Sequence, residues 1–269
     1  MDKYFDANKE LWNKWTEIHK DSEFYDLKGF LEGKDVLVTE EIKELGSVKG
    51  KSLLHLQCHF GMDTLNWARF GANVTGVDIS DEAITLAKTI AKQMKTDANF
   101  ICCNIYDLPK HLDEQFDIVY TSGGVLTWLP DLEGWANIIK TFLKPGGTFY
   151  IREFHPFLNI FDNTHETDLK IQYSYFPGEK PLEFIEERSY ADENIKTSKL
   201  SSYEWQFPLS KVITSLASVG LKIEFFHEFP YISYKAFPMF VQNDNGNWVF
   251  PDKNIELPMM FSLKASMCD

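Results

Sequence analysis

Residues 51–80 read KSLLHLQCHFGMDTLNWARFGANVTGVDIS, and this stretch decides the fold. Lys51–Leu56 is a short apolar run, which is typical of a buried strand. A tight turn then leads into Met62–Phe70, an amphipathic segment that predicts a helix. Gly71 follows it and is suited to end that helix. Asn73–Val77 predicts a second strand, so the order is strand, turn, helix, strand.

The turn and the tip of the second strand have the chemistry of a nucleotide site. Backbone N–H groups of the turn at 57–61 would lie at a helix N-terminus, where they can donate to a ligand. Asp78 directly follows the second strand, and its carboxylate can accept hydrogen bonds from ribose hydroxyls. Only Gly61 remains of a glycine-rich turn, so the G-x-G-x-x-G pattern of pyrophosphate sites is absent. The cofactor need therefore not be a dinucleotide.

Strand and helix patterns keep alternating beyond this stretch. Ser80 is a suitable N-cap for a helix that follows the second strand. Three further strands are predicted, at Asn99–Cys103, Phe116–Thr121 and Thr148–Glu153. Alternation at this spacing indicates βαβ units and a mainly parallel sheet.

Five segments between residues 50 and 155 form a series, namely LLHLQCHFG, VTGVDIS, NIYDLP, FDIVYTSGGVLTWLPD and LKPGG. Together, in this order and spacing, they resemble the class I S-adenosylmethionine (SAM) dependent methyltransferases of the small-molecule "methyltransferase type 11" kind. The resemblance implies a Rossmann-like α/β fold. It would have a seven-stranded, mostly parallel sheet with an antiparallel final strand, and helices on both faces.

Several positions depart from the residues that are usual in such families. The first turn usually holds an acidic residue and further glycines, where this chain has His55, Gln57 and His59. Asp is usual where Asn104 stands, and His is frequent where Thr127 stands. The side chains around the methionine end of the cofactor would therefore differ here.

Ligands of open parallel sheets lie beyond the C-terminal ends of the strands. With the resemblance, this rule makes SAM the expected cofactor and S-adenosyl-L-homocysteine the expected product. Asp78 would accept both ribose hydroxyls, and Ile79 would pack on the adenine. By resemblance, Asn104 and the backbone of Ile105 would hold the adenine edge. The expected cofactor residues are Gln57, Cys58, His59, Gly61, Asp78, Ile79, Asn104, Ile105, Thr121 and Ser122.

Methyl transfer from a sulfonium is an in-line displacement of an excellent leaving group. Much of its acceleration can come from alignment of the reactants and exclusion of water. A general base helps only if the acceptor has a proton to lose. Glu153 and His155, at the end of the fifth strand, are the best-placed candidates. The alternative for His155 is a structural turn residue ahead of Pro156.

The N-terminal segment is unusually aromatic for a part of the chain outside the core fold. We predict that residues 1–46 form a helical lid over cofactor and substrate, although plain packing on the sheet's helices is the alternative. Trp12, Trp15, Tyr25 and Trp128 are expected to line the substrate pocket, because pockets are typically lined by aromatic residues. If they converge, they could hold an amine or another cation by cation–π attraction. An apolar pocket or plain core is the alternative.

Residues 156–203 interrupt the regular pattern with prolines, aromatics and scattered charges. We predict that they form an inserted cap on the substrate pocket, with a short hairpin that pairs Leu169–Phe176 with Glu183–Ala191. Long irregular segments of this kind are usually functional or carry structure of their own. Residues 47–155 and 204–269 would then make up the SAM-binding domain.

The overall composition restricts the kinds of binding partner that we expect for this chain. The 269 residues include 40 Asp and Glu against 27 Lys and Arg, a net charge of −13, which makes nucleic acid an unfavourable partner. No apolar run is long enough to cross a bilayer, and no signal peptide is evident, so we expect a cytoplasmic protein without a membrane partner. The four cysteines and seven histidines show no metal-ligand spacing. The chain is expected to be a monomer or a homodimer.

These observations favour a SAM-dependent methyltransferase that acts on an N, O, S or C atom of a small molecule. One alternative is an NAD(P)-dependent oxidoreductase on a similar sheet, which the missing glycines disfavour. The other is a SAM-binding module without turnover, which the altered first turn leaves open. Fold by itself does not decide among these functions.

Overall fold

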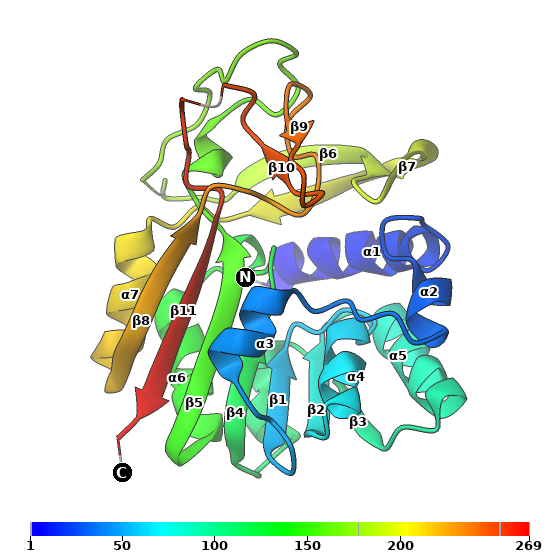
Figure 1. Ribbon diagram of the computed structural model, residues 1–269, viewed down its shortest axis with the longest axis vertical. Helices are drawn as coiled ribbons and strands as arrows, with labels where there is room; N and C mark the ends of the chain where they lie inside the picture. The colour runs from blue at the N-terminus through cyan, green and yellow to red at the C-terminus, as the bar shows by residue number, and fades with distance from the viewer. Residues whose placement is uncertain (1, 177, 253, 269) are drawn as a thin grey trace.

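The computed structural model describes residues 2–176, 178–252 and 254–268. Its central sheet has seven strands in the order β3-β2-β1-β4-β5-β11-β8 (Figure 1). β11 runs antiparallel to both of its neighbours, while the pairs from β3 to β5 are parallel. The strands are β1 Ser52–Leu56, β2 Asn73–Asp78, β3 Ala98–Cys102, β4 Phe116–Thr121, β5 Leu143–Phe154, β8 Leu221–Phe229 and β11 Met260–Met267. The expected Rossmann-like sheet with an antiparallel final strand is confirmed.

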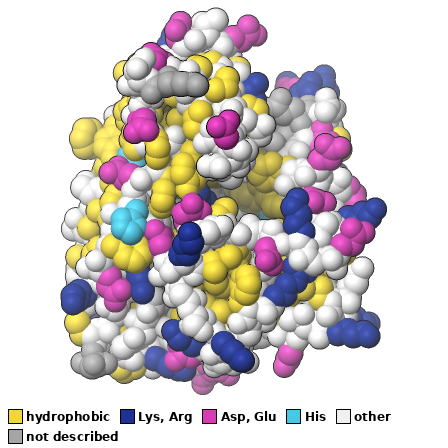
Figure 2. All heavy atoms as spheres, viewed as in Figure 1, with side chains coloured by type: hydrophobic (Ala, Val, Ile, Leu, Met, Phe, Trp, Pro, Cys, Tyr) yellow, Lys and Arg dark blue, Asp and Glu magenta, His cyan; other side chains and the backbone are white. Residues whose placement is uncertain are grey.

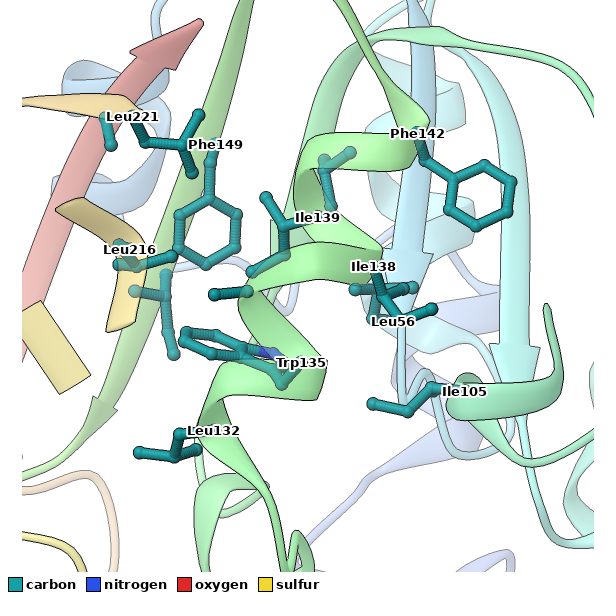
Figure 3. Close-up of a cluster of buried hydrophobic side chains, with 14 of the residues drawn as sticks. Leu56, Ile105, Leu132, Trp135, Ile138, Ile139, Phe142, Phe149, Leu216 and Leu221 are labelled. Atoms are coloured by element: carbon teal, nitrogen blue, oxygen red, sulfur yellow. The ribbon is translucent and has the colours of Figure 1, made fainter. Parts of the chain in front are cut away.

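Helices cover both faces of the sheet, because successive strand residues point to opposite sides. Leu53 packs with Trp67 and Tyr150 on the face of α3 and α4, and α5 packs on the same side. Leu56 packs on the opposite face with α6, whose Trp135 is fully buried (Figure 3). The helices are α3 Thr39–Leu45, α4 Met62–Arg69, α5 Asp81–Met94, α6 Leu132–Phe142 and α7 Leu209–Ser218. No helix among the described residues is both long and apolar enough to span a membrane.

The elements that are not part of this core gather over the C-terminal ends of the parallel strands (Figure 1). The long helix α1 lies there, with an antiparallel hairpin above it and an irregular loop region beside the hairpin. The elements are α1 Asp2–His19, α2 Leu27–Leu31, β6 Leu182–Ser189, β7 Asp192–Glu204, β9 Val241–Gln242, β10 Trp248–Val249, and the 3-10 turns η1 Ile105–Lys110, η2 Leu126–Trp128 and η3 Leu158–Ile160.

The hairpin differs from the predicted one. The segment at 183–191 does pair, but with β7, the stretch that follows it, in a register that sets Leu182 opposite Glu204. The predicted partner at 169–176 forms a single bridge, from Ile171 to Phe161. Ser189 pairs with Asp192 across a two-residue connection. Closing so short a loop costs less entropy than reaching back to the earlier segment, which explains the choice of partner.

Helix α1 is hydrogen-bonded to the hairpin above it. The amide of Asn8 both donates to the backbone of Tyr203 (2.8 Å) and accepts from it (2.8 Å). The Trp15 indole donates to the Arg188 carbonyl at 3.2 Å. On the side of the core, Asn13 accepts from the Ser80 hydroxyl at 2.6 Å. One helix therefore links the hairpin to the cofactor side of the sheet.

Candidate active site

A cavity of about 840 Å³ lies between the C-terminal ends of the strands, α1 and the hairpin. Figure 2 shows the surface hollowed in this region, with hydrophobic side chains inside. The cavity is lined by all the residues that the sequence predicts for the cofactor, the substrate and catalysis, apart from Thr121 and His155. Thr121 is fully buried and is not among the residues that line the cavity.

The turn after β1 has an unusual backbone. Gln57 and His59 have φ of +58° and +50°, in the left-handed region, and Gly61 has φ of +78°. A residue with a side chain pays about 1–2 kcal/mol for this conformation. These are the turn positions where the resembled families have glycine. At Gly61 a side chain is also excluded by space, because a Cβ would lie 2.7 Å from the ring of Phe100.

Asp78 joins this turn to the end of β2. Its Oδ2 accepts the His59 N–H at 2.8 Å, and its Oδ1 accepts the Ser80 N–H at 2.9 Å. Burial raises the pKa of Asp78 to about 6, against the effect of these hydrogen bonds, so the group is mostly ionised at neutral pH. Each carboxylate oxygen has about two acceptor sites. A third backbone N–H, that of Ile79, also lowers the pKa of Asp78, so at least one acceptor site of the carboxylate is left for a ligand in the cavity.

His55 occupies the position where the resembled families have an acidic residue. The ring is 1% exposed, with Nδ1 2.8 Å from the Thr64 hydroxyl and Nε2 3.2 Å from the Ser122 hydroxyl. Burial lowers the pKa of His55 to about 3, so the ring is neutral. It supports Ser122, which lines the cavity, but brings no charge to it.

Glu153 shapes the cavity wall. Its carboxylate accepts four backbone N–H groups at 2.5–3.0 Å, from Gly124, Val125, Leu126 and Phe154. Burial raises the pKa of Glu153 and the four hydrogen bonds lower it. With its acceptor sites taken, this carboxylate holds the loop after β4 rather than a substrate proton.

His155 is not among the residues that line the cavity, and its contacts are those of the alternative reading, a structural turn residue. Its Nδ1 accepts the Phe157 N–H at 3.1 Å, and its Nε2 lies 2.9 Å from Glu228 Oε1. Nε2 therefore carries the proton of the neutral ring. Both nitrogens are therefore used in holding the turn after β5.

The predicted aromatic residues come together. The ring centroid of Trp12 lies 5.3 Å from Trp15, 5.4 Å from Trp128 and 5.1 Å from His59, all in edge-to-face contacts. Tyr25 lies 5.5 Å from His59. Edge-to-face packing is favourable in its own right. The rings thus form one wall of the cavity while they also pack on one another.

His19 is a site residue that sequence reasoning missed. It is fully buried, with Nδ1 2.8 Å from His59 Nε2 and Nε2 2.7 Å from the Ser189 hydroxyl. Burial lowers the pKa of His19 to about 3. These contacts connect α1 to both the cofactor turn and the hairpin. The spacing of Trp12, Trp15 and His19 along one helix face was the signal available in the sequence.

Arg152 is a second residue that was missed. It lies next to Glu153 on β5, lines the cavity, and is only 6% exposed. The sequence feature that could have identified Arg152 is a charged residue inside the apolar run of a buried strand. Asp63 and Glu41, from α4 and α3, lie near enough for the guanidinium to lower their pKa values, although burial raises both on balance, that of Glu41 to about 7.

Carboxylates dominate the charges around the cavity. Glu204 and Glu186 from the hairpin face it, and they accept hydrogen bonds from Thr127 and Ser202, each at 3.2 Å. Burial raises the pKa of Glu204 to about 7. The acidic lining residues are Glu23, Asp26, Asp35, Glu41, Asp63, Asp78, Glu153, Glu186 and Glu204, against Lys34 and Arg152. The described part of the chain has no group of three or more His, Cys, Asp or Glu residues that could hold a metal ion.

Comparison with known proteins finds similarity over the part of the chain that holds the turn after β1 and Asp78. Residues 54–151 match the family described as a methyltransferase domain. This part of the chain is similar to a methyltransferase domain. A ubiquinone biosynthesis O-methyltransferase of Hydrogenovibrio crunogenus is 29% identical to it over 138 residues, which are 51% of this chain and 54% of the relative. The chain spans about half the length of the curated relatives it matches.

Solved structures resemble the methyltransferase domain together with its additions. A SAM-dependent methyltransferase from Mesorhizobium loti has a TM-score of 0.60 at 17% identity, over 88% of this chain and 99% of that one. The glycopeptide N-methyltransferase MtfA, solved in complex with SAM, has a TM-score of 0.54 at 16% identity, over 85% and 91%. At these identities the likeness concerns the fold, which is that of SAM-dependent methyltransferases.

Proposed function

We propose that the protein is a SAM-dependent methyltransferase that transfers a methyl group to a small molecule. The observation that carries the proposal is the free acceptor capacity of Asp78, which faces a large cavity beside the turn of the methyltransferase domain. Two vicinal ribose hydroxyls are the donors that such a carboxylate suits.

The other lining residues fit SAM as well. Gln57 Oε1 and His59 Nδ1 are buried atoms without a hydrogen-bond partner among the described residues, and both side chains line the cavity. Ile79 and Ile105 offer apolar surface to an adenine ring. We therefore retain the predicted cofactor residues other than Thr121 as proposed ligands of SAM.

SAM would supply an activated methyl group, and the protein would align the reactants and exclude water from them. The α1 aromatic residues and the hairpin cover the cavity, while Glu153 holds the loop after β4 in place. Alignment and exclusion of water can supply much of the rate of such a displacement. The carboxylates of Glu186 and Glu204 favour a neutral or cationic acceptor, whether its reactive atom is N, O, S or C.

The acceptor of the relatives is not carried over to this chain. The matched residues, 54–151, hold the cofactor turn and Asp78, whereas α1 and the hairpin lie outside them. Those outer elements supply the roof of the cavity. We propose, as the sequence predicts, a lid at 1–46, a cap at 156–203 and a SAM-binding domain in the remainder.

The alternatives are weaker. In a doubly wound dinucleotide fold the strands follow the order 3-2-1-4-5-6 in parallel. Here the antiparallel β11 is inserted between β5 and β8, which disfavours an NAD(P)-dependent oxidoreductase. A SAM-binding module without turnover has the same fold, so only a measurement of transfer separates it from an enzyme.

Calorimetric titrations with SAM, S-adenosyl-L-homocysteine and NADH test the cofactor. We expect binding of the first two and none of NADH. Incubation of the protein with SAM and a panel of small amines, phenols, thiols and carboxylic acids, followed by mass spectrometry, tests turnover. Binding without formation of S-adenosyl-L-homocysteine for any acceptor would favour the non-catalytic module. Binding of NADH alone would overturn the proposal.

A further inference from the structure

Arg152 is a buried cation that is not directly paired with the nearest buried carboxyl groups, Glu41 and Asp63. Its side chain is 6% exposed, and its Nε has no hydrogen-bond partner among the described residues. No carboxylate of the described chain lies within ion-pair distance, although such pairs are formed elsewhere, for example by Lys144 and Asp117 at 2.9 Å. Burying a guanidinium is costly unless an anion accompanies it. The site therefore has the chemistry of one that awaits a negatively charged group.

The nearest carboxylates are directed elsewhere. Glu41 accepts the Tyr120 hydroxyl at 2.8 Å and the Val38 N–H at 3.2 Å. Asp63 is hydrogen-bonded by Ser122, while the guanidinium contacts two neutral groups, Tyr231 and the ring of Phe229, whose centroid lies 5.8 Å from Cζ. Burial raises the pKa of Glu41 to about 7, so this carboxyl is only partly ionised at neutral pH.

The surroundings of Arg152 also favour an anion. Asp63 belongs to the first turn of α4, and the guanidinium lowers its pKa, so the charge of Arg152 acts on the positive end of that helix. The N-cap of α4 is Gly61, which has no side chain to satisfy the free N–H groups. Arg152, Gly61 and the turn residue Gln57 all line the same cavity.

We propose that Arg152 binds a carboxylate of a ligand in this cavity. The planar guanidinium presents a fork of donors that matches a carboxylate. The inference rests on the proposed function. The carboxylate has two chemical sources, the amino-acid end of SAM or a carboxylate on the methyl acceptor. The α4 N-cap and the cofactor turn line the same cavity as Arg152, which favours the first.

Paired titrations separate the sources. S-adenosyl-L-homocysteine carries the carboxylate, and 5′-methylthioadenosine keeps the adenine, ribose and thioether but lacks it. Arg152→Gln is expected to weaken the binding of S-adenosyl-L-homocysteine by roughly 10- to 100-fold, which is the effect of losing a hydrogen bond between charged groups. The affinity for 5′-methylthioadenosine should stay within about two-fold of the wild-type value, because the hydrogen bonds to its ribose and adenine are unchanged. Lys34→Gln is the matched control, since Lys34 also lines the cavity but is paired with Asp26 at 2.8 Å, and it should change neither affinity.

The acceptor source is tested with benzoate added to protein saturated with S-adenosyl-L-homocysteine. Loss of benzoate binding in Arg152→Gln, with cofactor affinity intact, would assign the residue to the acceptor. The inference would be overturned if Arg152→Gln left the affinities for S-adenosyl-L-homocysteine and benzoate unchanged. It would also be overturned if the affinity for 5′-methylthioadenosine fell as much as that for S-adenosyl-L-homocysteine. If Arg152→Gln does not fold, Arg152→Lys replaces it and should lose several-fold affinity for S-adenosyl-L-homocysteine, because it keeps the charge without the fork. Wild-type protein that binds neither nucleoside would instead contradict the proposed function.

Discussion

Replacement of Asp78 by Asn tests the cofactor site most directly. Each oxygen of Asp78 accepts a backbone N–H, from His59 or Ser80, and the carboxylate keeps acceptor capacity for the ligand. Asn keeps one oxygen, and its amide nitrogen would face a backbone donor and could accept nothing. The variant therefore loses one charged acceptor outright and weakens the other. At about 1.5–3 kcal/mol for a hydrogen bond to a charged group, we expect a loss of about 3 kcal/mol.

That loss corresponds to a roughly 150-fold increase in the Kd for S-adenosyl-L-homocysteine. Calorimetry at pH 7.5 measures it, and circular dichroism checks that the variant is folded. Asp81→Asn is the control, because Asp81 is an exposed neighbour that pairs with Lys9 at 2.8 Å and does not line the cavity. Its affinity should match that of wild type.

The same carboxylate predicts a pH dependence. Burial raises the pKa of Asp78 to about 6, and only the ionised group accepts two hydroxyl hydrogen bonds. Wild-type affinity should therefore fall between pH 7.5 and pH 5, while that of Asp78→Asn changes less. Equal Kd values for wild type and Asp78→Asn at pH 7.5 would refute the assignment of the ribose to this residue.

Three further substitutions test the wall of the site. Glu153→Gln should lower the free energy of unfolding in urea by about 2–4 kcal/mol, because a backbone donor loses its acceptor, whereas half-exposed Glu228→Gln should cost less than about 1 kcal/mol. Equal losses would contradict this role. Gly61→Ala should cost about 1–3 kcal/mol more than Gly220→Ala, since both have positive φ but only Gly61 lacks space; urea unfolding showing equal costs would refute the steric argument. Burial raises the pKa of Glu41 to about 7, so the free energy of unfolding of wild type falls as the pH rises from 4.5 to 7. The free energy of unfolding of Glu41→Gln, taken relative to that of wild type, should therefore increase by about 2 kcal/mol between pH 5.5 and pH 8. A difference that does not change with pH would disprove the shift.

The topology could be predicted from the sequence because its signals are local. The strand at Ser52–Leu56, the left-handed Gly61 and the acidic tip at Asp78 follow one another within a single stretch. The rule that ligands lie at the C-terminal ends of parallel strands then placed most of the candidate residues at one cavity.

Contacts between distant parts of the chain were beyond such reasoning. His19 meets His59, 40 residues away, and Ser189, 170 residues away, and no local period encodes either pairing. Arg152 was visible as a charge on a buried strand, but its lack of a counter-ion emerges only in three dimensions. The placement of the His155 side chain could not be predicted for a similar reason, because proximity to a strand end does not fix the direction in which the following turn leaves the sheet.

The attachment of α1 to both sides of the cavity has a consequence for ligand entry. Asn8 ties the helix to the hairpin, and His19 joins hairpin and cofactor turn through one imidazole. Swinging the hairpin outward without α1 would take Ser189 away from His19 and leave Nε2 of this buried ring without a partner. The two elements should consequently travel together as a hinged gate, and a disulfide between them would leave passage of ligands intact, whereas one that fastens α1 to α5 would obstruct it.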